Sequence, residues 1–263
     1  MTTLTPTAPG QLATVSKPRT GSILRSERIK FLSTRSPWWC MALTAVLAIG
    51  FGMLVAGTSD FGENRIYYTL GGMGLAQSIV MIMATIAITS EYRFGTIRTT
   101  FQLSPNRTRV LWTKAAMVGG AAAVFGEILA FATFYLAKLV AKDDHILEIH
   151  GGTAWRQVAG HGLVYAIAAI IALGVGAIIR QTAGAVSLIL VWTLLVENLV
   201  TLIPNVGQDI YRWMPFVNGT LFAADPEFGG DNPLSPWPAL GVFAATGLII
   251  MLAATVVVRR RDA

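Results

Sequence analysis

Six long apolar runs, separated by shorter polar connections, dominate the pattern of hydrophobic and polar positions along the chain. A membrane-spanning helix needs about 20 consecutive, mostly apolar residues, and each of these runs is long enough. Trp or Tyr lies at several of their ends, as in the interfacial belts of membrane proteins. The pattern therefore predicts an all-α integral membrane protein with six transmembrane helices. The predicted spans cover approximately residues 38–58, 69–89, 111–137, 158–179, 183–203 and 236–258.

The composition supports this class. Of the 263 residues, 54% are hydrophobic and 13% are charged, whereas soluble domains carry about 25% charged residues. So few charges cannot cover a water-exposed surface. The single cysteine, Cys40, excludes a disulfide within the chain, and no Cys/His spacing suggests a metal or redox site.

The N-terminal segment divides into two parts. Residues 1–21 are rich in Thr, Pro, Ser and Gly and predict a disordered cytoplasmic tail. Residues 22–36, SILRSERIKFLSTRS, mix apolar and basic positions and predict an N-terminal amphipathic interfacial helix whose basic groups lie near anionic headgroups. Residues 22–263 then form one six-span transmembrane domain.

The distribution of basic residues predicts the orientation. With the N-terminus inside, fifteen of the 20 Lys and Arg residues fall in inner segments. An excess of Lys and Arg marks the cytoplasmic side. We therefore expect a multi-pass protein of the plasma membrane with both termini in the cytoplasm. The five basic residues of the outer segments are Arg65, Lys138, Lys142, Arg156 and Arg212.

Two segments outside the spans carry unusual sequences. Residues 90–100, SEYRFGTIRTT, are followed by Ser104-Pro105 and basic residues, and they form the largest inner loop. Ser90 predicts an N-cap for a short cytoplasmic helix starting at Glu91. Residues 204–235 connect spans 5 and 6, and their many aromatic side chains predict a partly re-entrant outer segment packed on protein.

These residues resemble a known family. SERIKFLSTRSPWW at 26–39, the 90–100 loop and YRWMPFVNGTLF at 211–222, together with the six-span topology, are similar to a bacterial permease of the ABC-2 type. In this exporter class a six-span subunit works with a separate ATPase. The resemblance covers approximately residues 22–260.

The resemblance implies partners and coupling residues. It implies a homo- or heterodimer of permease subunits in the lipid bilayer and a nucleotide-binding ATPase subunit, with no role for nucleic acid. The chain has no phosphate-loop motif. We therefore expect no cofactor here, and ATP and Mg in the partner. The helix after span 2 would be the coupling helix that docks on the ATPase, through Glu91, Tyr92, Arg93 and Thr96. A solvated linker whose arginines only set topology is the alternative.

Further candidates lie within the spans. By the resemblance, spans 2 and 5 line the substrate path. Ionisable residues inside spans are costly and are functional candidates by default, although a hydrogen-bonded structural acid is the alternative for both Glu127 and Glu197. Met73, Gln77, Met81 and Thr85 recur every four residues on one face of span 2, which suits a tolerant substrate surface or ordinary helix packing. The expected path residues are Met73, Gln77, Met81, Thr85, Glu197 and Asn198.

Two outer motifs have simpler interpretations. DDHILEIH at 143–150 contains possible metal ligands, but it is typical of a hydrated polar loop, and we expect no metal. Asn218-Gly219-Thr220 matches a glycosylation acceptor, and a chance match in a turn is the simpler interpretation.

The sequence thus favours the permease subunit of an ATP-driven exporter of an amphipathic or hydrophobic substrate, such as a drug-like compound, peptide or lipid. We expect no enzymatic activity in this chain, because Cys40 and the three histidines form no catalytic pattern. The alternative is a secondary transporter or another polytopic membrane protein without an ATPase partner. The sequence shows no internal repeat that would support a secondary transporter.

The predicted topology can be tested by thiol labelling. In a Cys40→Ala background, single cysteines placed near residues 145 and 225 should react with an impermeant thiol reagent in intact cells. A cysteine near residue 100 should react only after the membrane is opened, because the excess of basic residues places this loop inside. If the reagent labels a cysteine near residue 100 but not one near residue 225 in intact cells, the predicted orientation is wrong.

Overall fold

The computed structural model describes residues 35–58, 65–97, 106–141, 147–224 and 233–260, which form helices and connecting turns without a strand. Within these ranges, six helices are long and apolar enough to cross a membrane. Their bounds differ from the predicted spans by a few residues, so the six-helix prediction is confirmed. Most of the predicted surface helix at 22–36 lies outside the described residues. The six helices are Trp38–Thr58, Ile66–Arg93, Arg107–Val140, Gly151–Ile179, Thr182–Val200 and Pro236–Arg260.

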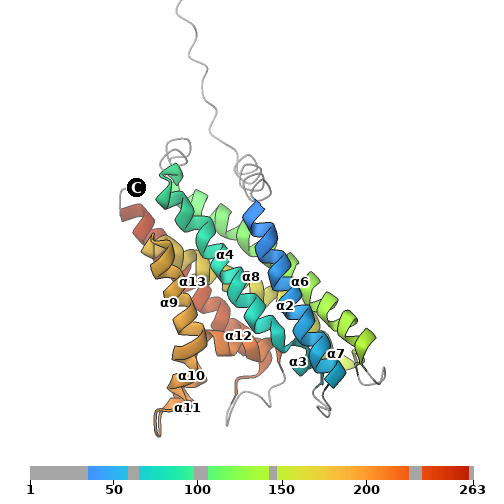
Figure 1. Ribbon diagram of the computed structural model, residues 1–263. Helices are drawn as coiled ribbons and strands as arrows, with labels where there is room; N and C mark the ends of the chain where they lie inside the picture. The colour runs from blue at the N-terminus through green and yellow to red at the C-terminus, as the bar shows by residue number, and fades with distance from the viewer. Residues whose placement is uncertain (1–34, 59–64, 98–105, 142–146, 225–232, 261–263) are drawn as a thin grey trace, which may run out of the picture.

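Three of these helices are built from shorter elements. The second joins α3, η2 and α4, the fourth joins α7 and α8, and the fifth joins α9, the π-helical segment η4 and α10. Two short helices, α11 and α12, follow before the last span (Figure 1). The elements are α2 (Arg35–Thr58), α3 (Arg65–Thr69), η2 (Leu70–Gly72), α4 (Met73–Arg93), α6 (Arg107–Val140), α7 (Gly151–Ala159), α8 (His161–Ile179), α9 (Thr182–Val191), η4 (Trp192–Val196), α10 (Glu197–Val200), α11 (Gly207–Tyr211), α12 (Pro215–Ala223) and α13 (Pro236–Arg260).

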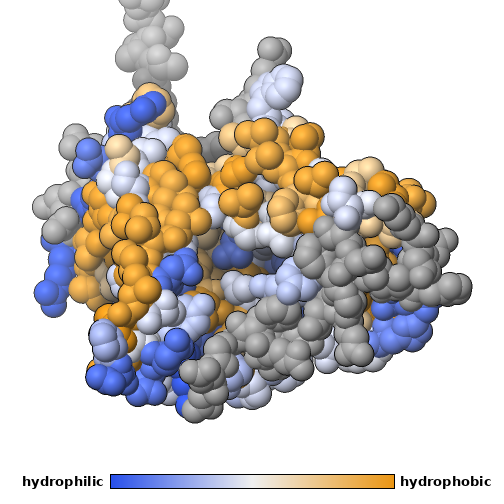
Figure 2. All heavy atoms as spheres, turned by 60° about the horizontal axis from the view of Figure 1, so that its bottom comes forward, coloured by the Kyte–Doolittle hydropathy of each residue, from blue (hydrophilic) through white to orange (hydrophobic). Residues whose placement is uncertain are grey.

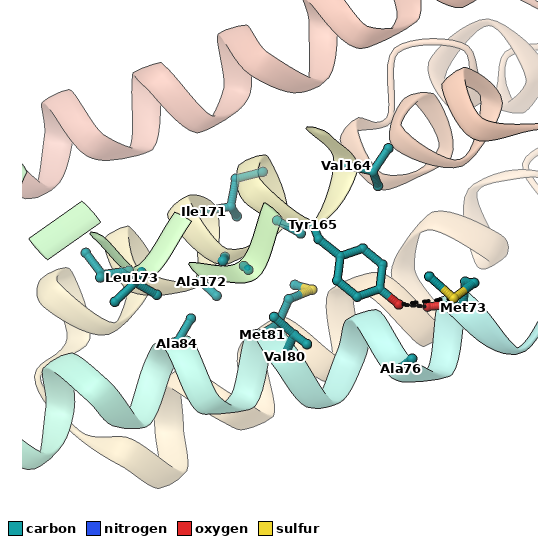
Figure 3. Close-up of a cluster of buried hydrophobic side chains, with 14 of the residues drawn as sticks. Met73, Ala76, Val80, Met81, Ala84, Val164, Tyr165, Ile171, Ala172 and Leu173 are labelled. Atoms are coloured by element: carbon teal, nitrogen blue, oxygen red, sulfur yellow. Dashed lines mark hydrogen bonds between the residues drawn. The ribbon is translucent and has the colours of Figure 1, made fainter. Parts of the chain in front are cut away.

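Helix α8 lies at the centre of the bundle and packs against α4, α6 and α13. The span that contains it is the most buried of the six. Small residues permit the close approach, because a Cβ added at Gly126 of α6 would lie 2.6 Å from the Tyr165 ring of α8. Figure 3 shows Tyr165 pointing from α8 to α4, where its hydroxyl donates a hydrogen bond to the Met73 carbonyl at 2.8 Å.

The C-terminal end of α4 differs from the sequence prediction. Ser90 does not cap a new helix: it lies inside α4, and its carbonyl accepts a hydrogen bond from the Phe94 N–H at 2.9 Å. Glu91 therefore belongs to the last turn of α4. The helix ends only at Phe94, and Gly95 then adopts a left-handed φ of 68°, which glycine tolerates best. Thr96 and Ile97 are again helical, and the following residues 98–105 lie outside the described ranges.

Span 5 and the segment after it pack on one side and one end of the bundle. Helix α9 contacts α8 and α4 along one side, and much of its apolar surface is exposed. Helix α12 packs on α13, α8 and α7, at the opposite end of the bundle from the C-terminal end of α4 (Figure 1). The position of this segment relative to a bilayer, and hence its re-entrant character, stays a prediction.

The packing of α6 on α8 gives a stability prediction. Gly126→Ala should lower the free energy of unfolding in detergent by about 1–3 kcal/mol, because the new methyl group overlaps the Tyr165 ring. Gly120→Ala, on the same helix, is the matched control. No atom lies within 4 Å of its added Cβ, so alanine should stabilise the helix by up to about 1 kcal/mol. Equal effects of the two substitutions would contradict this packing.

Candidate functional site

Charged side chains hold both ends of α12. The two oxygens of Glu197 accept hydrogen bonds from the N–H groups of Phe216 at 3.0 Å and Val217 at 2.8 Å. At the other end, the Arg156 guanidinium donates to the carbonyls of Leu221 and Phe222. An acid at the N-terminus of a helix and a cation at its C-terminus both interact favourably with the helix dipole. Span 5 and α7 together therefore fix the position of α12.

The π-helical segment η4 helps to place Glu197. A π-helix accommodates more residues per turn than an α-helix and often occurs at functional sites. Trp192 and Glu197, five residues apart, here lie on one face, and the indole N–H donates to the carboxylate at 3.0 Å. Only 2% of Glu197 is exposed. Burial raises the pKa of the nearby Tyr211 hydroxyl above its ordinary value, and the Glu197 carboxylate acts in the same direction.

A cavity of about 100 Å³ lies between α12, α8 and the N-terminal half of span 2. Met73 and Gln77 line it from α4, His161 lines it from α8, and Thr220 lines it from α12. Figure 2 views the molecule from the side of α11 and α12 and shows a hollow with hydrophilic residues between two apolar lobes. Helix α12 is thus a wall of a cavity whose remaining walls belong to two spans.

The structure separates the predicted path residues into two groups. Met73 and Gln77 line the cavity. Met81 and Thr85 are buried against α8, with the Thr85 hydroxyl 2.9 Å from the Met81 carbonyl and 3.4 Å from the Ala172 carbonyl. Within the single chain, Met81 and Thr85 therefore pack α4 against α8.

The remaining candidates make local contacts. Asn198 is exposed, and its amide donates to the Leu194 carbonyl at 3.1 Å. Glu127 accepts a hydrogen bond from the Gly162 N–H at 3.1 Å and so links α6 to the start of α8. Asn218 is fully buried, and its side-chain nitrogen donates to the carbonyls of Arg212 and Met214. These bonds support the interpretation of the Asn218 motif as a chance match.

At the C-terminal end of α4, Glu91 forms a buried ion pair. Its Oε1 lies 3.0 Å from Nζ of Lys114 on α6, and Glu91 and Lys114 are only 7% and 3% exposed. Two neighbouring contacts join the same region to the start of span 5. The Arg180 guanidinium lies 4.9 Å from the centre of the Tyr92 ring, and the Thr182 hydroxyl donates to Thr89 at 2.9 Å. Spans 2, 3 and 5 are therefore connected where α4 ends.

The four predicted coupling residues lie on two sides of this cluster. Glu91 and Tyr92 face the protein, whereas Arg93 and Thr96 are exposed. The Arg93 guanidinium lies 4.5 Å from the centre of the exposed Phe94 ring. The Thr96 hydroxyl is 3.4 Å from the Glu91 carbonyl. Among the described residues, the exposed surface next to the ion pair thus includes Arg93, Phe94, Gly95 and Thr96.

Three residues of these sites escaped the sequence analysis as candidates: Lys114, Arg156 and His161. A signal existed for Lys114, since it lies inside the predicted third span, where an ionisable group needs a partner. The same signal existed for His161, which lies inside the predicted fourth span. Arg156 gives no comparable signal, because it lies outside the predicted spans and its contacts are made with residues distant in the sequence. Among the described residues, no three His, Cys, Asp or Glu side chains come together as a metal site. His145 of the 143–150 motif lies outside the described ranges.

No protein-family model matches this chain, and no curated protein matches its sequence. The fold defines a helical protein with six helices able to span a membrane.

The contact between Glu197 and α12 predicts a change in amide exchange. Glu197→Ala removes two hydrogen bonds from a charged acceptor, each contributing about 1.5–3 kcal/mol. Hydrogen–deuterium exchange at Phe216 and Val217 should become about 10–100-fold faster, and Glu197→Gln should have a smaller effect. Asn198→Ala, which alters only an exposed neighbour, should leave this exchange unchanged. Unaltered exchange in Glu197→Ala would show that α12 is held by other contacts.

Proposed function

We propose that this chain is the permease subunit of an ATP-driven exporter of the ABC-2 type. In this proposal two permease subunits act with a separate nucleotide-binding ATPase, and the substrate is an amphipathic or hydrophobic compound exported across the plasma membrane. The six-helix fold and the resemblance of the 90–100 loop support it. The observation that carries the proposal is the buried Glu91–Lys114 pair at the base of this loop.

A loop that transmits force to membrane spans needs a rigid attachment to them. The Glu91–Lys114 pair ties the inner end of span 2 to span 3 on the two sides of residues 98–105. Span 6 joins the same region, because the Arg107 guanidinium donates to the Val258 carbonyl at 3.4 Å and the Trp112 indole donates to the Thr255 hydroxyl at 3.2 Å. Movement of the loop therefore moves several spans together, as rigid-body coupling requires.

The proposal divides the work between buried and exposed residues. Arg93, Phe94 and Thr96 supply the surface that contacts the ATPase, since they are exposed beside the loop. Glu91 acts through Lys114 and keeps this surface in place. This differs from the initial hypothesis, in which Glu91 itself met a basic group on the ATPase, because its carboxylate is occupied within the chain.

At the outer end, the cavity under α12 forms part of the substrate path. Met73 and Gln77 contact the substrate there, and α12 is the element that opens or closes the outer side. Glu197 positions α12 and does not contact the substrate. Since Glu197 belongs to span 5, a displacement of this span relative to α8 also displaces α12.

Charge reversal tests the coupling proposal. Glu91→Lys and Lys114→Glu each leave like charges buried together, and breaking a buried pair costs about 3–5 kcal/mol. Each single variant should lower recovery of the ATPase complex and substrate-stimulated ATP hydrolysis at least tenfold. The double variant with exchanged charges should restore most of both, because the pair forms again. The measurements are co-purification from native membranes and ATPase assays in lipid.

Arg93→Ala is the matched control at the exposed surface. It should weaken ATPase recovery without changing the thermal stability of the isolated permease, whereas the single charge reversals should lower both. The double variant with exchanged charges could regain its stability and still fail to bind the ATPase. That result would indicate that Glu91 contacts the ATPase directly. If no ATPase is recovered with the unaltered chain, the exporter proposal fails and a transporter without such a partner becomes the better interpretation.

A further inference from the structure

The walls of the cavity under α12 are polar in part, yet among the described residues they carry no permanently charged side chain. The polar side chains are Tyr67, Gln77, His161 and Thr220, and the other lining residues are apolar or glycine. A charged group placed there would lose its hydration without gaining a counter-ion, which is strongly unfavourable. The lining therefore selects for an uncharged group that can form hydrogen bonds.

His161 is the most informative of these residues. It is only 7% exposed and is one of the residues that line the cavity. The backbone carbonyls of Gln157 and Val158, one turn earlier, lie beside the imidazole. From the same helix the Tyr165 ring meets it edge-on at 6.4 Å. A neutral imidazole has one donor and one acceptor nitrogen, so His161 gives the cavity wall a group that can form a hydrogen bond without carrying a charge.

We propose that this cavity binds the uncharged, hydrogen-bonding end of an amphiphile, such as a primary amide or a hydroxyl group. His161 and Gln77 form the hydrogen bonds, and Met73 and Val164 contact the adjoining aliphatic carbons. His161 is thereby a specificity-determining residue of the site. That this end belongs to an exported substrate rests on the proposed function, whereas the binding itself does not.

The size of the cavity limits the group that fits. A water molecule needs about 10–15 Å³ on this measure, and an apolar cavity of about 150 Å³ accommodates benzene. A cavity of about 100 Å³ therefore accepts a group of about five non-hydrogen atoms. A larger amphiphile enters with one end and leaves the rest of its length outside the cavity.

Nitrogen NMR of the histidine rings tests this proposal directly. The chain has three histidines, so His161 can be assigned by loss of its signal in His161→Phe. The full chain, labelled with 15N in its imidazoles and held in lipid nanodiscs, is titrated with propionamide, propionate or propylammonium. We expect propionamide to shift the His161 ring signal saturably, with a Kd on the order of 1 mM for so small a ligand. Propionate and propylammonium should leave it unshifted.

Two variants sharpen the test. Gln77→Leu keeps the volume and removes the amide, and it should weaken propionamide binding about tenfold, as expected for a lost hydrogen bond. His150→Phe, at an exposed position, should leave binding unchanged. Gln77→Leu retains the His161 signal, which His145→Phe and His150→Phe assign by elimination if His161→Phe does not fold.

Two outcomes would overturn the proposal. One is a His161 signal that propionamide does not move, which would assign the cavity to water. The other is an equal shift by propionate or propylammonium, which would remove the preference for uncharged groups. Failure of the exporter proposal can be distinguished from failure of this binding proposal. If only the exporter proposal fails, propionamide still binds while no ATPase is recovered with the chain.

Discussion

The close packing of α8 against α4, α6 and α13 is the constraint on which the rest of the structure depends. Between helices in lipid, association relies on van der Waals contact and hydrogen bonds, because the surrounding acyl chains are as apolar as the helices. Gly126 and Gly176 leave room where α8 meets its neighbours. Both candidate sites are built at the ends of this helix: His161 begins it beside the cavity, and Arg180 follows its last turn beside Tyr92.

The few charged groups inside the helical bundle join elements together. Glu91 connects span 2 to Lys114 of span 3, Glu127 connects span 3 to the start of α8, and Glu197 connects span 5 to α12. An unpaired ionisable group is costly at membrane depth, so each of these contacts favours one relative placement of two elements. The acids therefore set the geometry of the bundle, while the cavity itself is lined by uncharged polar groups.

Span 5 links the two ends of the bundle. Near its N-terminal end, Thr182 donates to Thr89 near the Glu91–Lys114 pair, and near its C-terminal end Glu197 caps α12. Between these points it contacts only one side of the bundle and exposes much apolar surface. Fewer packing contacts make an element easier to displace. In the proposed exporter this arrangement lets an event at the cytoplasmic loop reach the helix that covers the cavity.

The sequence by itself determined the six helices, because apolar length is a local property that any window of the chain displays. It also identified Glu127 and Glu197 as groups in need of partners. Only the tertiary structure decided what those partners are: Glu127 meets the Gly162 N–H 35 residues away, and Glu197 meets N–H groups 19 and 20 residues away. It also showed that α4 continues through Ser90 and that Met81 and Thr85 face α8 while Gln77 faces a cavity. Three separate segments form that cavity, and their approach depends on packing between helices, which no local pattern encodes.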